Sequence, residues 1–393
     1  SSTPSHTPTP LSYLPLVQHE FPDGLIVLAL REGLYSRLFL YEPKTLPLTR
    51  LTNGNWDDIT PALSPDGTRL AFASNRSGHF DLYVLELLTG DITRLMDTPE
   101  YDAHPTWSPD GLFLAYESYQ PNEFGENNLD IFIAPVDGSN APIRLTNDPA
   151  PDYAPAWSPL GRQVAFVSTR SGEPEIWLAD LQNPDERFAN LSRSPNSLDA
   201  YPTWSPAGTT LAWGTIVNGI HTLRVAPVPV PGLDVDPLQA RAGFAGDWSV
   251  YSPDGETLLT VLKTPNESFL TAYHLPSNGL LALPPMPLPG PVEGLAWGSA
   301  SIPQPPPASI LVAAQATPGL LWQPKVTPNL DLPADRQHLV RLFDVQVPDP
   351  RLHDIADESF NALRETTAQI TGWDFLGTLE NAYVSLTSPL LPG

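Results

Sequence analysis

Trp107-Ser-Pro-Asp-Gly111 is one copy of a short motif that recurs along this sequence of 393 residues. The tetrapeptide Ser-Pro-x-Gly, each time preceded by an aromatic or large apolar residue, begins at Ser64, Ser108, Ser158, Ser205 and Ser252. These starts are 44, 50, 47 and 47 residues apart, and Trp297-Gly-Ser299 marks a degenerate sixth copy. A fixed period of this length indicates an array of similar structural units.

Each repeat predicts four short strands. The run Gln163-Val-Ala-Phe-Val-Ser168 alternates with a period of two, which is typical of a half-buried strand. A polar turn, Thr169-Arg-Ser-Gly172, leads into the next strand, Glu175-Ile-Trp-Leu178, and we expect such turns to serve only as hairpins. In the Ser-Pro-x-Gly turn, proline presets φ and glycine takes the position with positive φ. Four-stranded units repeated every 40–50 residues or so are β-propeller blades.

A family resemblance rests on these repeats. The string Asp152-Tyr-Ala-Pro-Ala-Trp-Ser-Pro159, with the two strands that follow it, resembles the repeat of TolB-like propellers over residues 24–299. The fifth copy departs from the pattern because Gly246-Asp-Trp-Ser-Val-Tyr251 lacks the proline, and the sixth lacks Ser-Pro-Asp-Gly. Some propellers of this family stand before a serine peptidase domain, for which too few residues follow Trp297.

The strand count predicts how the ring closes. Trp297 begins a sixth inner strand, and the proline-rich run Pro303 to Pro307 ends the blade there. The three missing strands precede the first Ser-Pro-Asp-Gly, and we place them at 25–30, 37–41 and 48–52. The predicted fold is therefore all-β: a six-bladed β-propeller closed by its N-terminal and C-terminal strands, plus a small C-terminal α/β extension.

The segments outside the repeats give the domain organisation. We predict a Ser/Thr/Pro-rich extended tail at 1–23, the propeller at 24–299, a Pro-rich linker at 300–337 and a small module at 338–393. That module begins with a strand at 338–347. One helix follows, capped by Asp349, with Pro350 in its first turn and Gly372 after its end. The module looks truncated.

Composition excludes several classes of function. The chain has 44 acidic and 20 basic residues, a net charge of −24, which disfavours nucleic acid and anionic membrane surfaces as partners. It has no cysteine and no apolar run long enough to cross a bilayer. The eight histidines show no metal-binding spacing, and no nucleophile elbow or phosphate-binding loop occurs. We therefore predict a protein that is not an enzyme and needs no cofactor or metal.

One acidic residue per repeat precedes the aromatic position. The six are Asp58, Asp102, Asp152, Asp199, Asp247 and Glu293. Loops that enter innermost strands crowd around one mouth of a propeller channel, where six carboxylates would attract a cation or a basic peptide. Alternatively, each caps a turn by accepting bonds from backbone N–H groups. The tryptophans Trp107, Trp157, Trp204 and Trp297 are either inter-blade core, which we favour, or platforms for a ligand.

Three hypotheses for function stay open. The leading one is an extracellular or cell-surface structural protein that acts through protein contacts. It would self-assemble into an oligomer or filament, with its N-terminal tail packed on a neighbour. The second is a periplasmic TolB-like adaptor that binds a partner peptide at the acidic channel mouth. The third is an accessory domain of a larger secreted hydrolase.

Overall fold

A computed structural model describes residues 16–17, 20–121, 127–229, 241–263, 267–281, 286–300, 339–343, 375–376 and 382–385. The chain divides into two units, Ser1–Gly319 and Leu320–Gly393. The linker from residue 301 on and the helix predicted at 349–372 lie outside the described residues.

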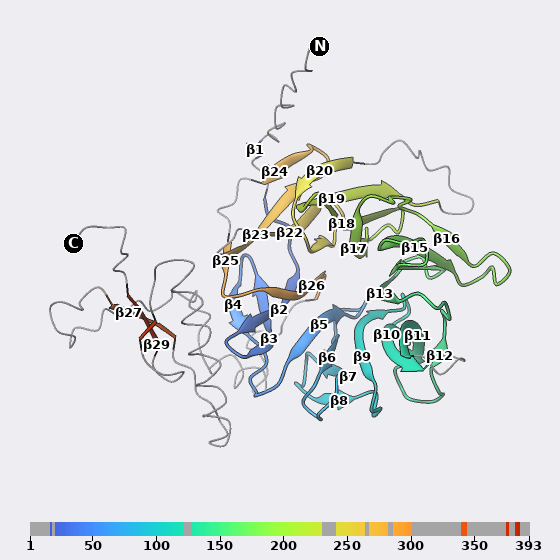
Figure 1. The fold of residues 1–393 in the computed structure, drawn as a ribbon, viewed down its shortest axis with the longest axis horizontal. Helices are drawn as coiled ribbons and strands as arrows, with labels where there is room; N and C mark the ends of the chain where they lie inside the picture. The colour runs from blue at the N-terminus through green and yellow to red at the C-terminus, as the bar shows by residue number, and fades with distance from the viewer. Residues whose placement is uncertain are drawn as a thin grey trace, which may run out of the picture. The chain divides into compact units, whose positions relative to one another are not determined.

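Six mainly antiparallel sheets of the first unit form the blades of a propeller (Figure 1). Blade 1 contains β5 (Asp58–Leu63), β6 (Arg69–Ser74), β7 (Asp81–Glu86) and β8 (Ile92–Arg94). Blade 2 contains β9 (Tyr101–Trp107), β10 (Phe113–Pro121), β11 (Asn127–Pro135) and β12 (Ile143–Arg144). Blade 3 contains β13 (Asp152–Trp157), β14 (Gln163–Ser168), β15 (Glu175–Asp180) and β16 (Phe188–Asn190).

The later blades are less regular. Blade 4 contains β17 (Leu198–Trp204), β18 (Thr210–Val217), β19 (Ile220–Pro227) and β20 (Arg241–Ala245). Blade 5 contains β21 (Ser249–Tyr251), β22 (Thr257–Lys263), β23 (Ser268–His274) and β24 (Gly279–Leu281), with β25 (Met286–Leu288) also on β23. The short β1 (Leu16–Val17) adds to β24 in parallel.

Blade 6 combines both ends of the propeller, as predicted from the strand count. Its order is β26 (Val292–Gly298), β2 (Leu25–Glu32), β3 (Tyr35–Glu42) and β4 (Leu46–Arg50), and Ile26 lies opposite Trp297. Figure 1 shows β26 beside β2, although they are far apart in the sequence. Gly294 allows blade 1 to approach, because a Cβ there would lie 2.5 Å from Cδ of Pro61.

The core consists of six apolar clusters, and each joins two neighbouring blades. β2 shows why, since its alternate residues serve two interfaces: Leu25 and Val27 pack toward blade 1, and Ile26 and Leu28 pack toward blade 5. All four side chains are fully buried. Because the clusters follow one another around the ring, the propeller is closed by packing as well as by strand pairing.

The second unit is described only by three strands. They are β27 (Leu339–Phe343), β28 (Phe375–Leu376) and β29 (Ala382–Ser385), in the antiparallel order β27-β29-β28. β27 falls within the strand predicted at 338–347. Among the described residues, no helix is long and apolar enough to cross a membrane.

Candidate functional site

The innermost strands of blades 1 to 4 share a bulge that shapes the central channel. Thr60, His104, Ala154 and Tyr201, each two residues after a predicted acidic residue, have positive φ values of 49°, 49°, 50° and 53°. A proline follows each of them, and the strand pairing shifts register at the same place. A bulge of this kind re-aims side chains. It brings these residues to the wall of a cavity of about 110 Å³ in the channel.

Three aromatic rings from different blades gather in this narrow part of the channel. The rings of Tyr201 and Trp248 stack with centroids 3.6 Å apart, and His104 lies parallel to Trp248 at 6.3 Å. Burial raises the pKa of Tyr201 to about 12, so its phenol is neutral at physiological pH. The three rings narrow the channel at the end where the inner strands begin.

Glu117 of β10 ties blades 2 and 3 together beside these rings. Its Oε1 lies 2.8 Å from Nδ1 of His104, and its Oε2 accepts a 2.8 Å hydrogen bond from the backbone N–H of Ala154. Burial alone would raise the pKa of Glu117, but the charge and hydrogen bond of His104 and the N–H of Ala154 hold this pKa below its usual value. Glu117 is therefore a buried, ionised brace between two blades.

The structure places the six predicted acidic residues within two residues of the starts of the six inner strands. We call this the acid end of the channel. Four of the six are at most 1% exposed: Asp58, Asp102, Asp152 and Asp199. Asp247 is also buried, whereas the Glu293 side chain is 30% exposed. The sequence thus located these residues in the fold but did not reveal that most of them face inward.

Two of these buried carboxylates form ion pairs with arginines from hairpin turns. Arg76 lies 2.8 Å from Asp58, and Arg170 lies 2.6 Å from Asp152. Both arginines are in the Asn/Thr-Arg-Ser-Gly turns, which we expected to serve only as hairpins. The expectation was incomplete, because these turns supply the cation that a buried carboxylate needs. The repeated arginine at one turn position was the sequence signal for this role.

The other carboxylates of the acid end have different partners. Thr98 donates its hydroxyl to Asp102 at 2.7 Å, and burial raises the pKa of Asp102. Lys263 pairs with Asp247. Glu293 pairs with Arg31 at 3.1 Å and accepts a 2.5 Å hydrogen bond from the hydroxyl of Ser36. The partners found for the six carboxylates are side chains, not the backbone N–H groups of the capping alternative.

A second buried acidic residue lies at or near the start of the third strand in blades 1 to 3. Asp81 pairs with Arg94 of β8 at 2.6 Å, and Asp130 pairs with Arg144 of β12. In blade 3, Asn190 of β16 donates to Glu175 at 2.6 Å. These contacts fasten the outermost strands to their blades, so the acid end of blades 1 to 3 has two buried acidic side chains in each blade.

The opposite end of the channel is an open funnel of about 540 Å³, lined by residues of all six blades. We call it the Ser-Pro funnel, because the Ser-Pro-x-Gly turns form its rim. Prolines at two levels line it: Pro61, Pro105, Pro155 and Pro202 on the wall, and Pro65, Pro109, Pro159, Pro206 and Pro253 at the rim. Since proline fixes φ, the backbone of this lining is rigid.

The tryptophans of the funnel have mainly a structural role. Trp107 donates its indole N–H to the carbonyl of Ala62, and Trp204 donates to that of Ala156, both at 2.9 Å and both across a blade interface. Trp157 differs because it donates at 3.2 Å to Gly161 in its own turn and is only partly buried.

Three exposed carboxylates, Asp66, Asp110 and Asp254, stand on the turns that form the rim. Each accepts a hydrogen bond from the serine hydroxyl two residues earlier. The hydrogen bond from Ser64 lowers the pKa of Asp66, and that from Ser108 lowers the pKa of Asp110. The rim of the funnel is therefore negatively charged at physiological pH.

Neither end of the channel offers a metal site in the part of the chain that the structure describes, where no cluster of three or more His, Asp or Glu side chains could hold an ion.

Comparison with known proteins agrees with the fold. The family model described as the TolB beta propeller domain matches residues 30–123. A "Protein TolB homolog" of Chlorobium luteolum is 35% identical over 134 residues, 34% of this chain and 29% of that protein. A "Tol-Pal system protein TolB" of Bordetella pertussis is 39% identical over 127 residues, 32% of this chain and 28% of the relative. The chain thus matches less than a third of the length of either relative.

Two solved structures share the architecture at low sequence identity. TolB from Acinetobacter baumannii superposes with a TM-score of 0.60 at 19% identity, covering 71% of this chain and 67% of that one. A chain of a nidogen/laminin complex gives a TM-score of 0.55 at 12% identity, covering 71% of this chain and all of the other. At such identities the likeness concerns the fold alone.

Proposed function

We propose that this chain, whose β-propeller is TolB-like, is a non-catalytic binding protein of the cell envelope that holds a segment of a partner protein in its Ser-Pro funnel. The observation that carries the proposal is the contrast between the two ends of one channel. At the acid end the three rings line a cavity of only about 110 Å³ and most of the carboxylates are buried. The funnel has a volume of about 540 Å³, is lined by residues of every blade and carries prolines from five of them. A concave, preformed site is the usual form of a binding site, and the prolines fix the backbone of this one.

The relatives support a protein partner and an envelope location. Several of them are named "Tol-Pal system protein TolB". This name indicates a protein that works together with other proteins. By analogy, the periplasm is the compartment that we favour, ahead of the extracellular surface. Because the matched segments are short, this analogy supports the kind of partner and not its identity.

The charge around the funnel indicates the chemistry of the partner. Asp66, Asp110 and Asp254 stand on the rim turns of a funnel with many prolines, so a segment with an apolar tip flanked by basic residues would be complementary to it. The carboxylates of the acid end are less suited to this role. Asp58 and Asp152 are almost fully buried and already paired with arginine, and a partner would have to displace that arginine to reach them.

The other hypotheses have less in their favour. Self-assembly was predicted from packing of the N-terminal tail on a neighbour, but the described part of that tail, Leu16–Val17, pairs with β24 of its own chain. No described contact favours a filament. A role as an accessory domain of a hydrolase stays a prediction, as does binding at the acid end.

Site-specific photo-crosslinking in cells that make the protein tests the proposal. A photoreactive phenylalanine analogue replaces Pro206 at the funnel rim, Glu293 at the acid end, or Ile220, an exposed residue of β19, as a control. We expect one protein to crosslink at position 206 and not at the other two. Crosslinking at position 293 alone would move the site to the acid end, and the absence of any crosslink at 206 or 293 would overturn the binding function.

A further inference from the structure

A second groove lies outside the channel, between blades 2 and 3. It has a volume of about 590 Å³, and its apolar lining comes from both blades. Three large side chains in it are unusually exposed: Ile143 at 71%, Leu160 at 50% and Phe113 at 38%. Exposed apolar side chains gathered in one place mark an interaction site more often than scattered ones do. Its residues Pro109, Trp157 and Pro159 also line the funnel, so the groove extends from the funnel rim.

One cation in this groove has no partner among the residues that the structure describes. Arg187, in the loop between β15 and β16, lines the groove beside Leu181 and Trp157. Its Nε is buried, and no described residue accepts a hydrogen bond from it or forms an ion pair with its guanidinium. A buried N–H without an acceptor costs free energy, and a carboxylate is the group that best matches the guanidinium fork.

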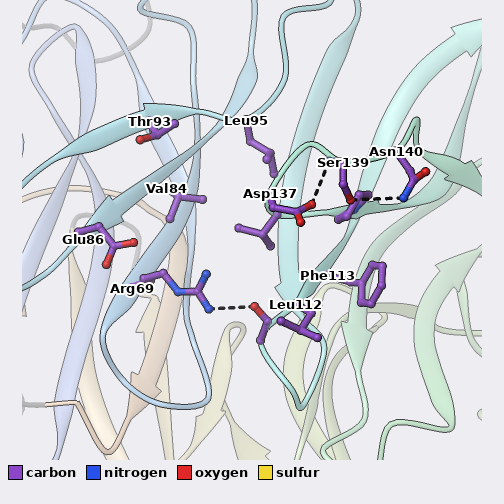
Figure 2. A pocket seen from close by; sticks show the side chains of 13 residues that line it. Arg69, Val84, Glu86, Thr93, Leu95, Leu112, Phe113, Asp137, Ser139 and Asn140 are labelled. Carbon is purple, nitrogen blue, oxygen red and sulfur yellow. Dashed lines mark hydrogen bonds between the residues drawn. The ribbon is translucent and has the colours of Figure 1, made fainter.

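The neighbouring groove shows that an unpaired arginine is not a general feature of this propeller. Figure 2 shows the groove of about 410 Å³ between blades 1 and 2, where Arg69 occupies the lining. There Arg69 donates a 2.8 Å hydrogen bond to the carbonyl of Gly111, and its guanidinium lies over the ring of Trp107 at 4.5 Å. That arginine already has its partners within the protein, whereas Arg187 has none among the described residues.

We propose that the groove between blades 2 and 3 is a second docking surface. It would bind a peptide segment of a partner protein with apolar side chains on either side of one carboxylate, which pairs with Arg187. The apolar side chains would cover Ile143, Leu160 and Phe113. An acidic ligand is unexpected for a chain of net charge −24, and it is the opposite of the basic partner proposed for the funnel. Asp110 of the funnel rim also lines this groove, so we expect the ligand's carboxylate to lie beside Arg187 and away from Asp110.

Subtractive selection from a library of random displayed peptides tests this inference. The library is enriched on the full chain and then depleted on the variant Arg187→Gln. We expect peptides that combine an acidic residue with apolar or aromatic neighbours to survive the depletion. For a selected peptide, Arg187→Gln should weaken binding about tenfold to a hundredfold, as should replacement of the peptide's acidic residue by its amide. Arg187→Lys should restore part of the affinity, because it keeps the charge but not the fork.

Matched controls separate this site from a general loss of folding or of funnel binding. Ile143→Ser should weaken the same peptides, whereas Ile220→Ser, at a similarly exposed isoleucine outside the groove, should not. Arg193→Gln removes an exposed arginine that does not line the groove, and it should have no effect. The inference is overturned if no peptide survives depletion, if the survivors lack an acidic residue, or if Ile143→Ser leaves their affinity unchanged while the variants unfold at the same temperature as the parent chain.

Discussion

The two ends of the channel are built from the same inner strands, yet they treat aspartate in opposite ways. At the acid end, Asp152 points into the protein and is neutralised by Arg170 from the next hairpin of its blade. At the rim of the funnel, Asp110 points outward and bonds the serine hydroxyl and a backbone N–H of its own turn. The first carboxylate stabilises the blade, and the second leaves charge available to a partner. The role follows from the groups within hydrogen-bonding reach, not from the residue type.

Removing a cation from the acid end should give the largest effect. In Arg170→Met the carboxylate of Asp152, which is fully buried, loses its counter-charge, and the stacking of the guanidinium near Trp177 and Phe188 is lost as well. We expect the free energy of unfolding to fall by about 3–5 kcal/mol, measured by denaturant titration. Arg193→Met at an exposed position is the matched control and should change it by about 0.5 kcal/mol or less. A loss below about 1 kcal/mol for Arg170→Met would show that the pair is not what stabilises the blade.

A smaller effect is expected from Glu117→Gln, which removes the charged brace between blades 2 and 3. The loss should be about 2 kcal/mol at neutral pH, since hydrogen bonds to a charged group are replaced by weaker ones. Because the folded-state pKa of Glu117 is lowered, its stabilisation is complete above the unfolded pKa and is lost as pH falls through the folded value. The difference between parent and variant should therefore shrink below about pH 4. A difference that stays constant on acidification would contradict this assignment.

Asp102→Asn should give a still smaller change, with the opposite dependence on pH. Burial raises the pKa of Asp102, which has a hydroxyl partner in Thr98 instead of a cation. The folded chain therefore holds this proton to higher pH than the unfolded chain, and stability is lost as pH rises through the window between the two pKa values. We expect the neutral variant to lie within about 1 kcal/mol of the parent at pH 7 and to gain stability relative to it from acid to neutral pH. The prediction would be wrong if the free energy of unfolding of the parent rose relative to that of the variant over this pH range. Such a result would mean that the fold stabilises the Asp102 carboxylate as an anion.

The fold could be predicted from the sequence because the repeat period is long and each turn carries a recognisable motif. Ser-Pro-x-Gly fixes where each blade turns, and counting strands against these turns predicts the pairing of β2 with β26 that the structure shows. The same alternation that predicted β2 as a strand also explains its two buried faces. Local pattern and global closure agree here, so the prediction was confirmed.

The channel was harder to predict from the sequence, because the solvent exposure of a side chain depends on the tertiary structure around it. One acidic residue per repeat correctly marked the starts of the inner strands, but burial depends on whether Arg76 or Arg170 folds back over the strand. The aromatic cluster of His104, Tyr201 and Trp248 was missed for a similar reason. His104 and Tyr201 share one repeat position, but Thr60 and Ala154 occupy it in the other two of blades 1 to 4, so residue type gave no signal there. Only the bulges with positive φ bring His104 and Tyr201 into the channel. Arg187 likewise carries no motif, and only its lack of a described partner singles it out.

The funnel rim should show the smallest effect on stability, which completes the contrast with the acid end. Pro206 is exposed and occupies the second position of a Ser-Pro-Ala-Gly turn, whose φ alanine can also adopt. Pro206→Ala should lower the free energy of unfolding by only about 0.4–1 kcal/mol, chiefly because the unfolded chain gains freedom. Denaturant unfolding measures this loss. The control is Ala207→Ser, a change at the neighbouring exposed residue of the same turn. A loss above about 2 kcal/mol would mean that the rim prolines hold the blades together, and the funnel would then be a structural element instead of a surface kept open for a partner.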